Sequence, residues 1–142
     1  MVFYKACVAH DLKRYQYQLS ALEIIPAKIK NLQEEYSVLQ AKQIDYIGGG
    51  ESKREDRLIN NIDERRNLER GLKIARRDVA LMKKALSALD DRERFVVEQY
   101  YMEAASAEWI AKELHLEKSM VYIIKDAAEI KLATMNYGTA ET

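Results

Sequence analysis

The chain has 142 residues, with 23 lysines and arginines balanced by 23 aspartates and glutamates, and it has one cysteine and one proline. A single cysteine excludes an intramolecular disulfide, and we interpret Cys7 as a small buried hydrophobic residue. No apolar run approaches the roughly 20 residues that a membrane-spanning helix needs, and no signal-peptide pattern opens the chain. We therefore expect a cytoplasmic protein with no membrane partner. Few glycines and prolines, together with weak strand signals, predict an all-α fold.

The first predicted helix covers about residues 2–46. Its apolar residues recur every three or four positions, as one face of a helix requires. They are Leu12, Tyr15, Leu19, Leu22, Ile25, Ile29, Leu32, Tyr36 and Leu39. The one irregular step precedes Pro26, and we predict a kink there because proline removes a helical hydrogen bond and clashes with the preceding turn. Three consecutive glycines at positions 48–50 predict the turn that ends this helix.

The second predicted helix runs from about residue 53 to residue 87 and carries another apolar stripe. The members of this stripe are Leu58, Ile62, Leu68, Leu72, Ala75, Val79, Met82 and Leu86. Two long helices joined by a short turn bury such stripes against each other, which predicts a long antiparallel hairpin over residues 1–87. The stripes offer more apolar surface than one partner helix covers, so we expect a homodimer formed through the hairpin.

Charge is distributed unevenly, because residues 1–52, 53–85 and 86–142 carry net charges of 0, +5 and −5. Four cations of the second helix share one face, and they are Arg66, Arg70, Lys73 and Arg77. Interleaved carboxylates favour a solvated face with local ion pairs. The acidic C-terminal segment instead favours a role in phosphate contacts, because a DNA-binding protein needs cations from some part of the chain. Both interpretations stay open.

Residues 88–136 are predicted to form a small domain of three helices, followed by a flexible tail at 137–142. Asp90 and Glu93 have the spacing of a capping box, and Ser106 can cap the second helix. The inward stripe of the third helix consists of Val121, Ile124, Ala128 and Leu132. A turn of about four residues around His115 separates the last two helices, which is the order of a helix-turn-helix.

A family resemblance lies in these helices. The run of Ile110, Ala111, Leu114, Leu116, Lys118, Val121, Ile124, Ala128, Lys131 and Leu132 resembles region 4 of bacterial primary sigma factors. With the upstream sequence, which includes DLKRYQYQLSALEIIPAKI, the chain from about Asp11 to Gly138 resembles the phage ArpU/RinA-type transcriptional regulators. The resemblance implies a protein of the bacterial host cytoplasm that binds double-stranded DNA and activates late and packaging genes of a phage. RNA polymerase is a further candidate partner.

The resemblance assigns recognition roles to the outward polar residues at the start of the last helix. These residues are Lys118, Ser119, Tyr122 and Lys125, with Lys112 and Lys131 as phosphate contacts.

An apolar stripe on the last helix departs from the family pattern, in which outward positions are mostly long and polar. Its members are Met120, Ile123, Ala127, Ile130 and Thr134, of which Met120, Ile123 and Ile130 form a candidate interaction face. Three interpretations are open: packing within the fold, dimerisation between C-terminal domains, and docking to RNA polymerase or another protein. The last interpretation would make the chain an adaptor with weak or no DNA binding.

An enzyme is not expected. The sequence offers no histidine, acid and nucleophile set, no metal-ligand spacing and no glycine-rich or strand-borne pocket. We therefore predict no catalytic residue, no metal and no cofactor.

Overall fold

The computed structural model describes residues 2–42 and 50–140, and the regular elements within these ranges are all helical. The elements in chain order are α1 (Val2–Ala41), α2 (Gly50–Ser87), α3 (Asp91–Val97), the π-helix η2 (Glu98–Met102), α4 (Ala107–Leu114) and α5 (Lys118–Tyr137). A long antiparallel pair, α1 and α2, is thus followed by a small C-terminal helical group. The predicted all-α fold class is confirmed. None of the described helices is long and apolar enough to cross a membrane.

Helix α1 continues through Pro26 without interruption. The kink predicted at that position stays a prediction. The glycine turn predicted at positions 48–50 falls mostly on residues 43–49, which lie outside the described residues, and Gly50 is the first residue of α2.

The chain divides into two compact units, each of which contains parts of both long helices. The hairpin unit comprises Gln18–Arg77. The head unit comprises the segment up to Tyr17, the end of α2 from Asp78, and the C-terminal helical group. This division differs from the domain boundary predicted after residue 87, because the final turns of α2 carry buried residues of the head unit, among them Val79, Met82 and Leu86.

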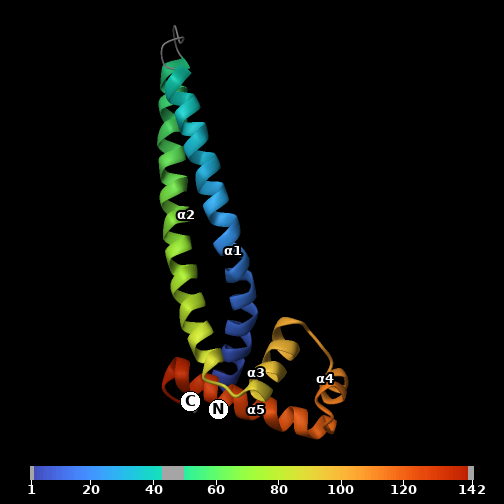
Figure 1. Cartoon of the computed structure of the whole chain (residues 1–142). Helices are drawn as coiled ribbons and strands as arrows, with labels where there is room; N and C mark the ends of the chain where they lie inside the picture. The colour runs from blue at the N-terminus through green and yellow to red at the C-terminus, as the bar shows by residue number, and fades with distance from the viewer. Residues whose placement is uncertain (1, 43–49, 141–142) are drawn as a thin grey trace. The chain divides into compact units, whose positions relative to one another are not determined.

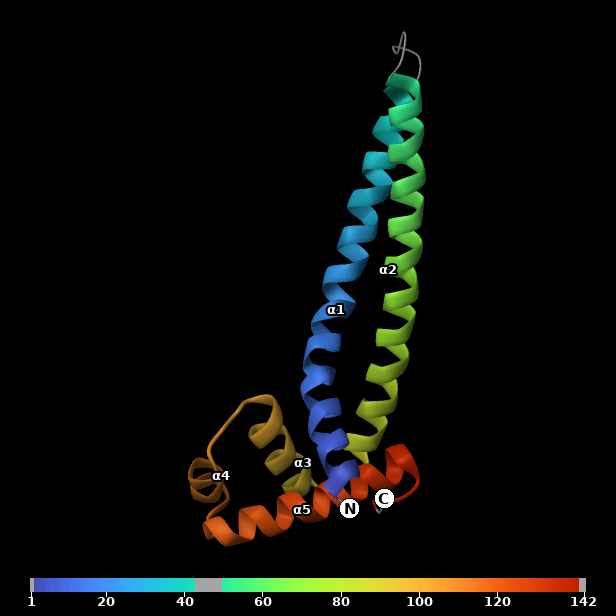
Figure 2. The same ribbon diagram turned by 180° about the vertical axis from the view of Figure 1, so that it is seen from behind.

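The hairpin unit consists of the parts of α1 and α2 between Gln18 and Arg77, which lie side by side in opposite directions (Figures 1 and 2). A buried polar contact fixes how the two helices are aligned. The Asn61 side chain donates to the Leu32 carbonyl at 2.8 Å and accepts from Arg65 Nε at 2.9 Å. The Arg65 guanidinium lies 4.9 Å from the Tyr36 ring centre. A polar group in an apolar seam specifies register in this way, because a shift would leave it without partners.

In the head unit, the start of α1 contributes core residues and contacts α5. Val8, Leu12 and Tyr15 are buried. At the surface, Tyr137 of α5 donates to Asp11, and its ring lies 5.2 Å from the ring of Tyr4. These contacts hold the C-terminal part of α5 against α1.

The C-terminal helical group has its own apolar core, in which α3 and α4 both pack against α5. Its buried members are Val96, Ala107, Ile110, Ala111, Val121 and Ile124. Arg94 ties this group to the end of α2, since its guanidinium donates to the carbonyls of Leu86 and Leu89 at 3.0 Å each. Arg94 thereby connects α3 to the last turn of α2 and to the residues that follow it.

Candidate nucleic-acid interface

Capping interactions place α4 and α5 in the order and spacing that the sequence predicts. The predicted capping box is present, with Glu93 N donating to Asp90 Oδ1 at 2.7 Å and Asp90 N donating to Glu93 Oε1 at 3.3 Å. Ser106 Oγ accepts from Trp109 N at 3.1 Å and so caps α4. His115 adopts the left-handed conformation at φ 57° and ψ 43°, which lets the chain leave α4 and enter α5 after three residues. No side-chain bond caps the start of α5.

The predicted inward stripe of α5 faces the core. Val121, Ile124, Ala128 and Leu132 are all buried. Ser119 and Tyr122 lie away from this stripe on the outward side of the helix, and both are exposed. The start of α5 is thus supported from inside while it presents hydroxyl groups to solvent.

Lys118, the first residue of α5, forms an ion pair with Glu108 of α4. Its Nζ lies 2.5 Å from Glu108 Oε1, and both side chains are more than half exposed. The hydrogen bond to Glu108 raises the pKa of Lys118, and the same bond lowers the pKa of Glu108. Solvent-exposed ion pairs are weak and are screened by salt, so a phosphate group can compete with Glu108 for Lys118.

Lys125 points into the head unit, although the resemblance assigns it to DNA reading. Its Nζ lies 3.2 Å from Glu129 Oε1 and 4.9 Å from the Tyr100 ring centre, with the rings of Tyr101 and Tyr122 at 5.8 and 6.0 Å. The side chain is only 15% exposed. Cation–π attraction and the carboxylate hold the ammonium group inside, so Lys125 is part of the support of α5.

Glu129 is the buried carboxylate of this cluster, with 3% of its surface exposed. It accepts hydrogen bonds from the Tyr101 hydroxyl and from Lys125. Burial raises the pKa of Glu129, while the charge of Lys5 acts to lower it.

The two predicted phosphate contacts of the C-terminal group differ in their surroundings. Lys112 is exposed on α4. Lys131 is also exposed, but its Nζ lies 2.8 Å from Glu93 Oε1, and this hydrogen bond raises the pKa of Lys131. Lys112 therefore has fewer interactions with other described residues than Lys131 has.

The apolar stripe of α5 is exposed. Met120 and Ile130 are well exposed, and Ile123 reaches 60% exposure. Ala127 and Thr134 lie between and beyond them, also in contact with solvent. The stripe therefore contacts solvent within the described part of the chain, and its three interpretations stay open.

The basic residues of α2 belong to the hairpin unit and are exposed on its surface. Arg66, Arg70 and Lys73 form no ion pair within the described ranges. Arg77 is exposed as well, but it has an interaction within the chain. The exposure of these side chains fits both interpretations, the solvated face and the phosphate contacts, so both stay open.

Two features near the site were not anticipated from the sequence. The helix that begins at Asp91 changes to a π-helix at Glu98, and Ala104 after it adopts a positive φ of 54°. The wider turn brings the neighbouring residues Tyr100 and Tyr101 into an edge-to-face pair, with ring centres 5.0 Å apart, and both rings lie near Lys125. The sequence offered one signal for this cluster. It contains three tyrosines, Tyr100, Tyr101 and Tyr122, and a lysine, Lys125, four residues before Glu129.

The described residues contain no group of three or more His, Cys, Asp or Glu side chains that could hold a metal ion. In comparisons with known proteins, no family model, no curated protein and no solved structure matches the chain.

Proposed function

We propose that the chain is a phage-type transcription regulator that binds double-stranded DNA through the start of α5, and that it is not an enzyme. The observation that carries the proposal is the arrangement of α4, the three-residue turn at His115 and α5 over a buried core, with Ser119 and Tyr122 on the outward side. In a helix-turn-helix protein the first residues of the second helix contact base edges in the major groove. The sigma region 4-like and ArpU/RinA-like sequence supports the same proposal.

Each exposed residue at the start of α5 has a chemical role in the proposal. The hydroxyls of Ser119 and Tyr122 can donate to or accept from base edges or phosphate oxygens. Lys118 exchanges Glu108 for a phosphate, and Lys112 contacts the phosphate backbone without first breaking an ion pair. Lys125 acts indirectly, because it holds α5 in place from inside.

Electrostatics limits the affinity that this surface supplies alone. Residues 86–142 carry a net charge of −5, whereas neutralisation of phosphates provides much of the affinity of DNA-binding proteins. Arg66, Arg70 and Lys73, which form no ion pair with another described residue, supply part of the missing positive charge in the proposal, as additional phosphate contacts. Activation of late and packaging genes, with RNA polymerase as the second partner, is the regulatory role that the resemblance supports.

The exposed stripe at Met120, Ile123 and Ile130 favours a second candidate function. Apolar side chains that stay exposed on a helix face often mark a protein-binding surface. An adaptor would use this stripe to dock on RNA polymerase or another phage protein and would bind DNA weakly or not at all. The two candidates differ in salt dependence, because phosphate contacts release counterions whereas apolar docking does not.

The proposal is tested by selecting duplexes from a random pool with the full chain and measuring affinity by fluorescence anisotropy at two salt concentrations. A DNA reader enriches a consensus, and its affinity falls with salt by a slope of about 0.9 per phosphate contacted. A Ser119→Ala, Tyr122→Phe double variant should lose preference for the consensus over random duplex. Ser20→Ala, an exposed hydroxyl on α1, is the matched control and should change nothing. No enrichment, combined with pull-down of RNA polymerase that depends on Ile123, would favour the adaptor.

A further inference from the structure

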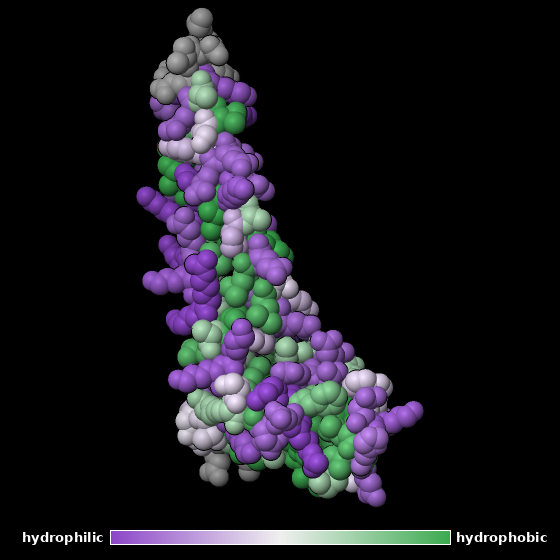
Figure 3. Space-filling model, viewed as in Figure 1, coloured by the Kyte–Doolittle hydropathy of each residue, from purple (hydrophilic) through white to green (hydrophobic). Residues whose placement is uncertain are grey.

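The hairpin unit covers its own apolar seam poorly. Among its described residues, only Leu72 and Ala75 are buried apolar side chains. The other seam residues are only half-buried, and they are Leu19, Leu22, Ile25, Ile29, Leu32, Tyr36, Leu39, Leu58, Ile62 and Leu68. Figure 3 shows hydrophobic surface running between hydrophilic side chains along these helices. Most of the seam therefore still contacts solvent.

Two helices alone cannot cover such a seam, because each stripe is wider than the contact with one neighbour. Long helices in water take most of their stability from packing of the apolar face. In a four-helix bundle each helix contacts two neighbours, and the stripes meet in a common core. The half-buried seam is thus the surface that a second helical pair would cover.

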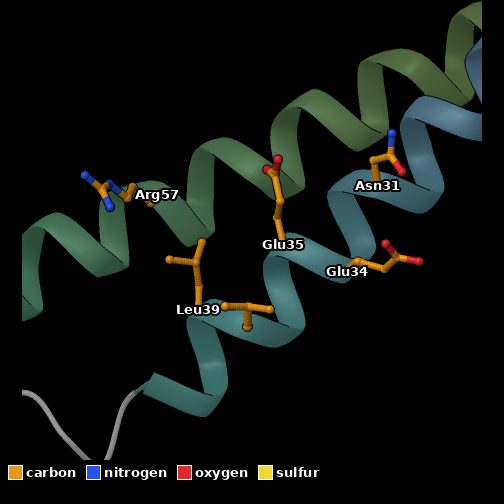
Figure 4. Close-up of a pocket in the computed structure, with 6 residues that line it drawn as sticks. Asn31, Glu34, Glu35, Leu39 and Arg57 are labelled. Atoms are coloured by element: carbon orange, nitrogen blue, oxygen red, sulfur yellow. The ribbon is translucent and has the colours of Figure 1, made fainter.

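An open groove of about 580 Å³ lies beside the seam and carries charges of both signs. Glu34, Glu35, Val38 and Leu39 line it from α1, and Arg57 lines it from α2 (Figure 4). Figure 4 shows Glu35 and Leu39 extending from α1 towards α2, with Glu34 directed away. Both glutamates and Arg57 are exposed, and no ion pair within the described ranges neutralises them.

We propose that a second copy of this chain occupies the seam and the groove, related by a twofold axis parallel to the helices. In this arrangement α1 of each copy lies between its own α2 and α2 of the second copy, so that every neighbouring pair is antiparallel. The Asn61 to Leu32 hydrogen bond aligns α1 with α2. Arg57 is one turn before Asn61, and Glu35 is one turn after Leu32, so these charges lie at the same height along the unit.

This alignment is what selects a second copy over another helical partner. A twofold axis along the helices preserves height, so Glu35 of one copy is brought level with Arg57 of the second copy, and the same contact forms again on the other side. The second copy also matches the seam in length. Opposite charges therefore meet at both edges of the apolar interface when the exposed Glu35 and Arg57 side chains turn towards the second copy. The inference does not depend on DNA binding.

The test measures self-association of the full chain in the absence of DNA, by sedimentation equilibrium. The wild-type chain should sediment at twice its mass of 16.5 kDa at about 10 µM. Glu35→Arg and Arg57→Glu should each weaken the dimer roughly tenfold, because each homodimer then contains two like-charge contacts. An equal mixture of the two variants should regain the wild-type affinity, because only the mixed dimer pairs opposite charges at both sites.

The mixing result is specific to contacts between copies, since mixing leaves each chain's internal contacts unchanged. Circular dichroism of each variant verifies that helix content is kept, and Glu23→Arg, an exposed carboxylate of α1 outside the groove, should leave the dimer intact. A helical wild-type chain that stays monomeric at about 100 µM would overturn the proposal. A dimer whose two charge variants gain nothing on mixing would overturn it too, because α1 would then not face α2 of the second copy.

Discussion

Replacement of Lys125 by methionine tests whether this lysine supports α5 from inside. The change keeps most of the apolar stem and removes the ammonium group that lies 3.2 Å from Glu129 and over the Tyr100 ring. Glu129, with 3% exposure, is then left as a buried carboxylate without its nearest cation. We expect the head unit to lose stability.

The size of the loss follows from burial. Removing one member of a fully buried ion pair costs about 3–5 kcal/mol. Lys125 is 15% exposed, and Glu129 keeps its hydrogen bond from Tyr101, so we expect a smaller loss of about 2–3 kcal/mol in the free energy of unfolding at pH 7. A second substitution, Glu129→Gln, removes the stranded charge and should restore most of the difference.

The loss should also depend on pH. Burial raises the pKa of Glu129 above its ordinary value of 4.5, so the folded protein keeps this proton to a higher pH than the unfolded chain does. The stability that this group contributes is complete below the unfolded pKa and declines as pH rises towards the folded pKa. Removing the Lys125 charge should raise the pKa of Glu129 in the folded protein further. The pH range over which the contribution of Glu129 to stability declines then becomes wider. Lys125→Met should therefore approach the wild type near pH 4 and diverge from it towards pH 7.

Urea denaturation followed by far-UV circular dichroism between about pH 4 and pH 7.5 measures this difference. Lys112→Met, at an exposed lysine of α4, is the matched control and should change stability by less than about 0.5 kcal/mol. A loss below about 1 kcal/mol, or an equal loss at every pH, would refute the reasoning, because Lys125 would then not neutralise a buried Glu129.

Three further predictions concern DNA binding by the exposed surface and the contacts of Arg94 with the end of α2. Glu108→Gln should strengthen binding to the selected duplex by releasing Lys118, while Glu113→Gln, at another exposed glutamate of α4, should have a smaller effect in the same anisotropy assay. Arg94→Met should lower the free energy of unfolding by about 2–3 kcal/mol in urea denaturation, because charge-assisted bonds to the carbonyls at the end of α2 are lost; an unchanged midpoint would contradict this. Neutralising three exposed cations of α2 should reduce the slope of log affinity against log salt by up to about 0.9 per residue that contacts a phosphate, and an unchanged slope would exclude them from the interface. The residues to change are Arg66, Arg70 and Lys73.

Local sequence signals predicted the local structure well. The Asp90 and Glu93 capping box, the Ser106 cap and the inward stripe of α5 are present. Each depends on residues within about one or two turns of each other, so the spacing along the chain already determines the geometry. The short turn around His115 has the same explanation, because the predicted helix-turn-helix order already separates the two helices by only a few residues.

Features that depend on contacts between distant segments were not predictable in the same way. From its position in the helix alone, Lys125 is predicted to be an outward polar residue. Its burial depends on Tyr100 and Tyr101, which belong to the π-helix η2 and lie near its ammonium group. A prediction from helical periodicity assumes a regular α-helix with about 3.6 residues per turn. It therefore did not show where the helix changes to the wider π-helical turn. The division of the chain after Tyr17 also escaped prediction, since the apolar stripe of α1 continues across it without a change of period.

Hydrogen exchange of the full chain with and without the selected duplex tests the central claim most directly. If the start of α5 reads DNA, backbone amides between Ser106 and Ile123 should gain protection with the selected duplex and less with a random one. Protection confined to other parts of the chain, with the start of α5 unchanged, would contradict a DNA-reading role for this helix.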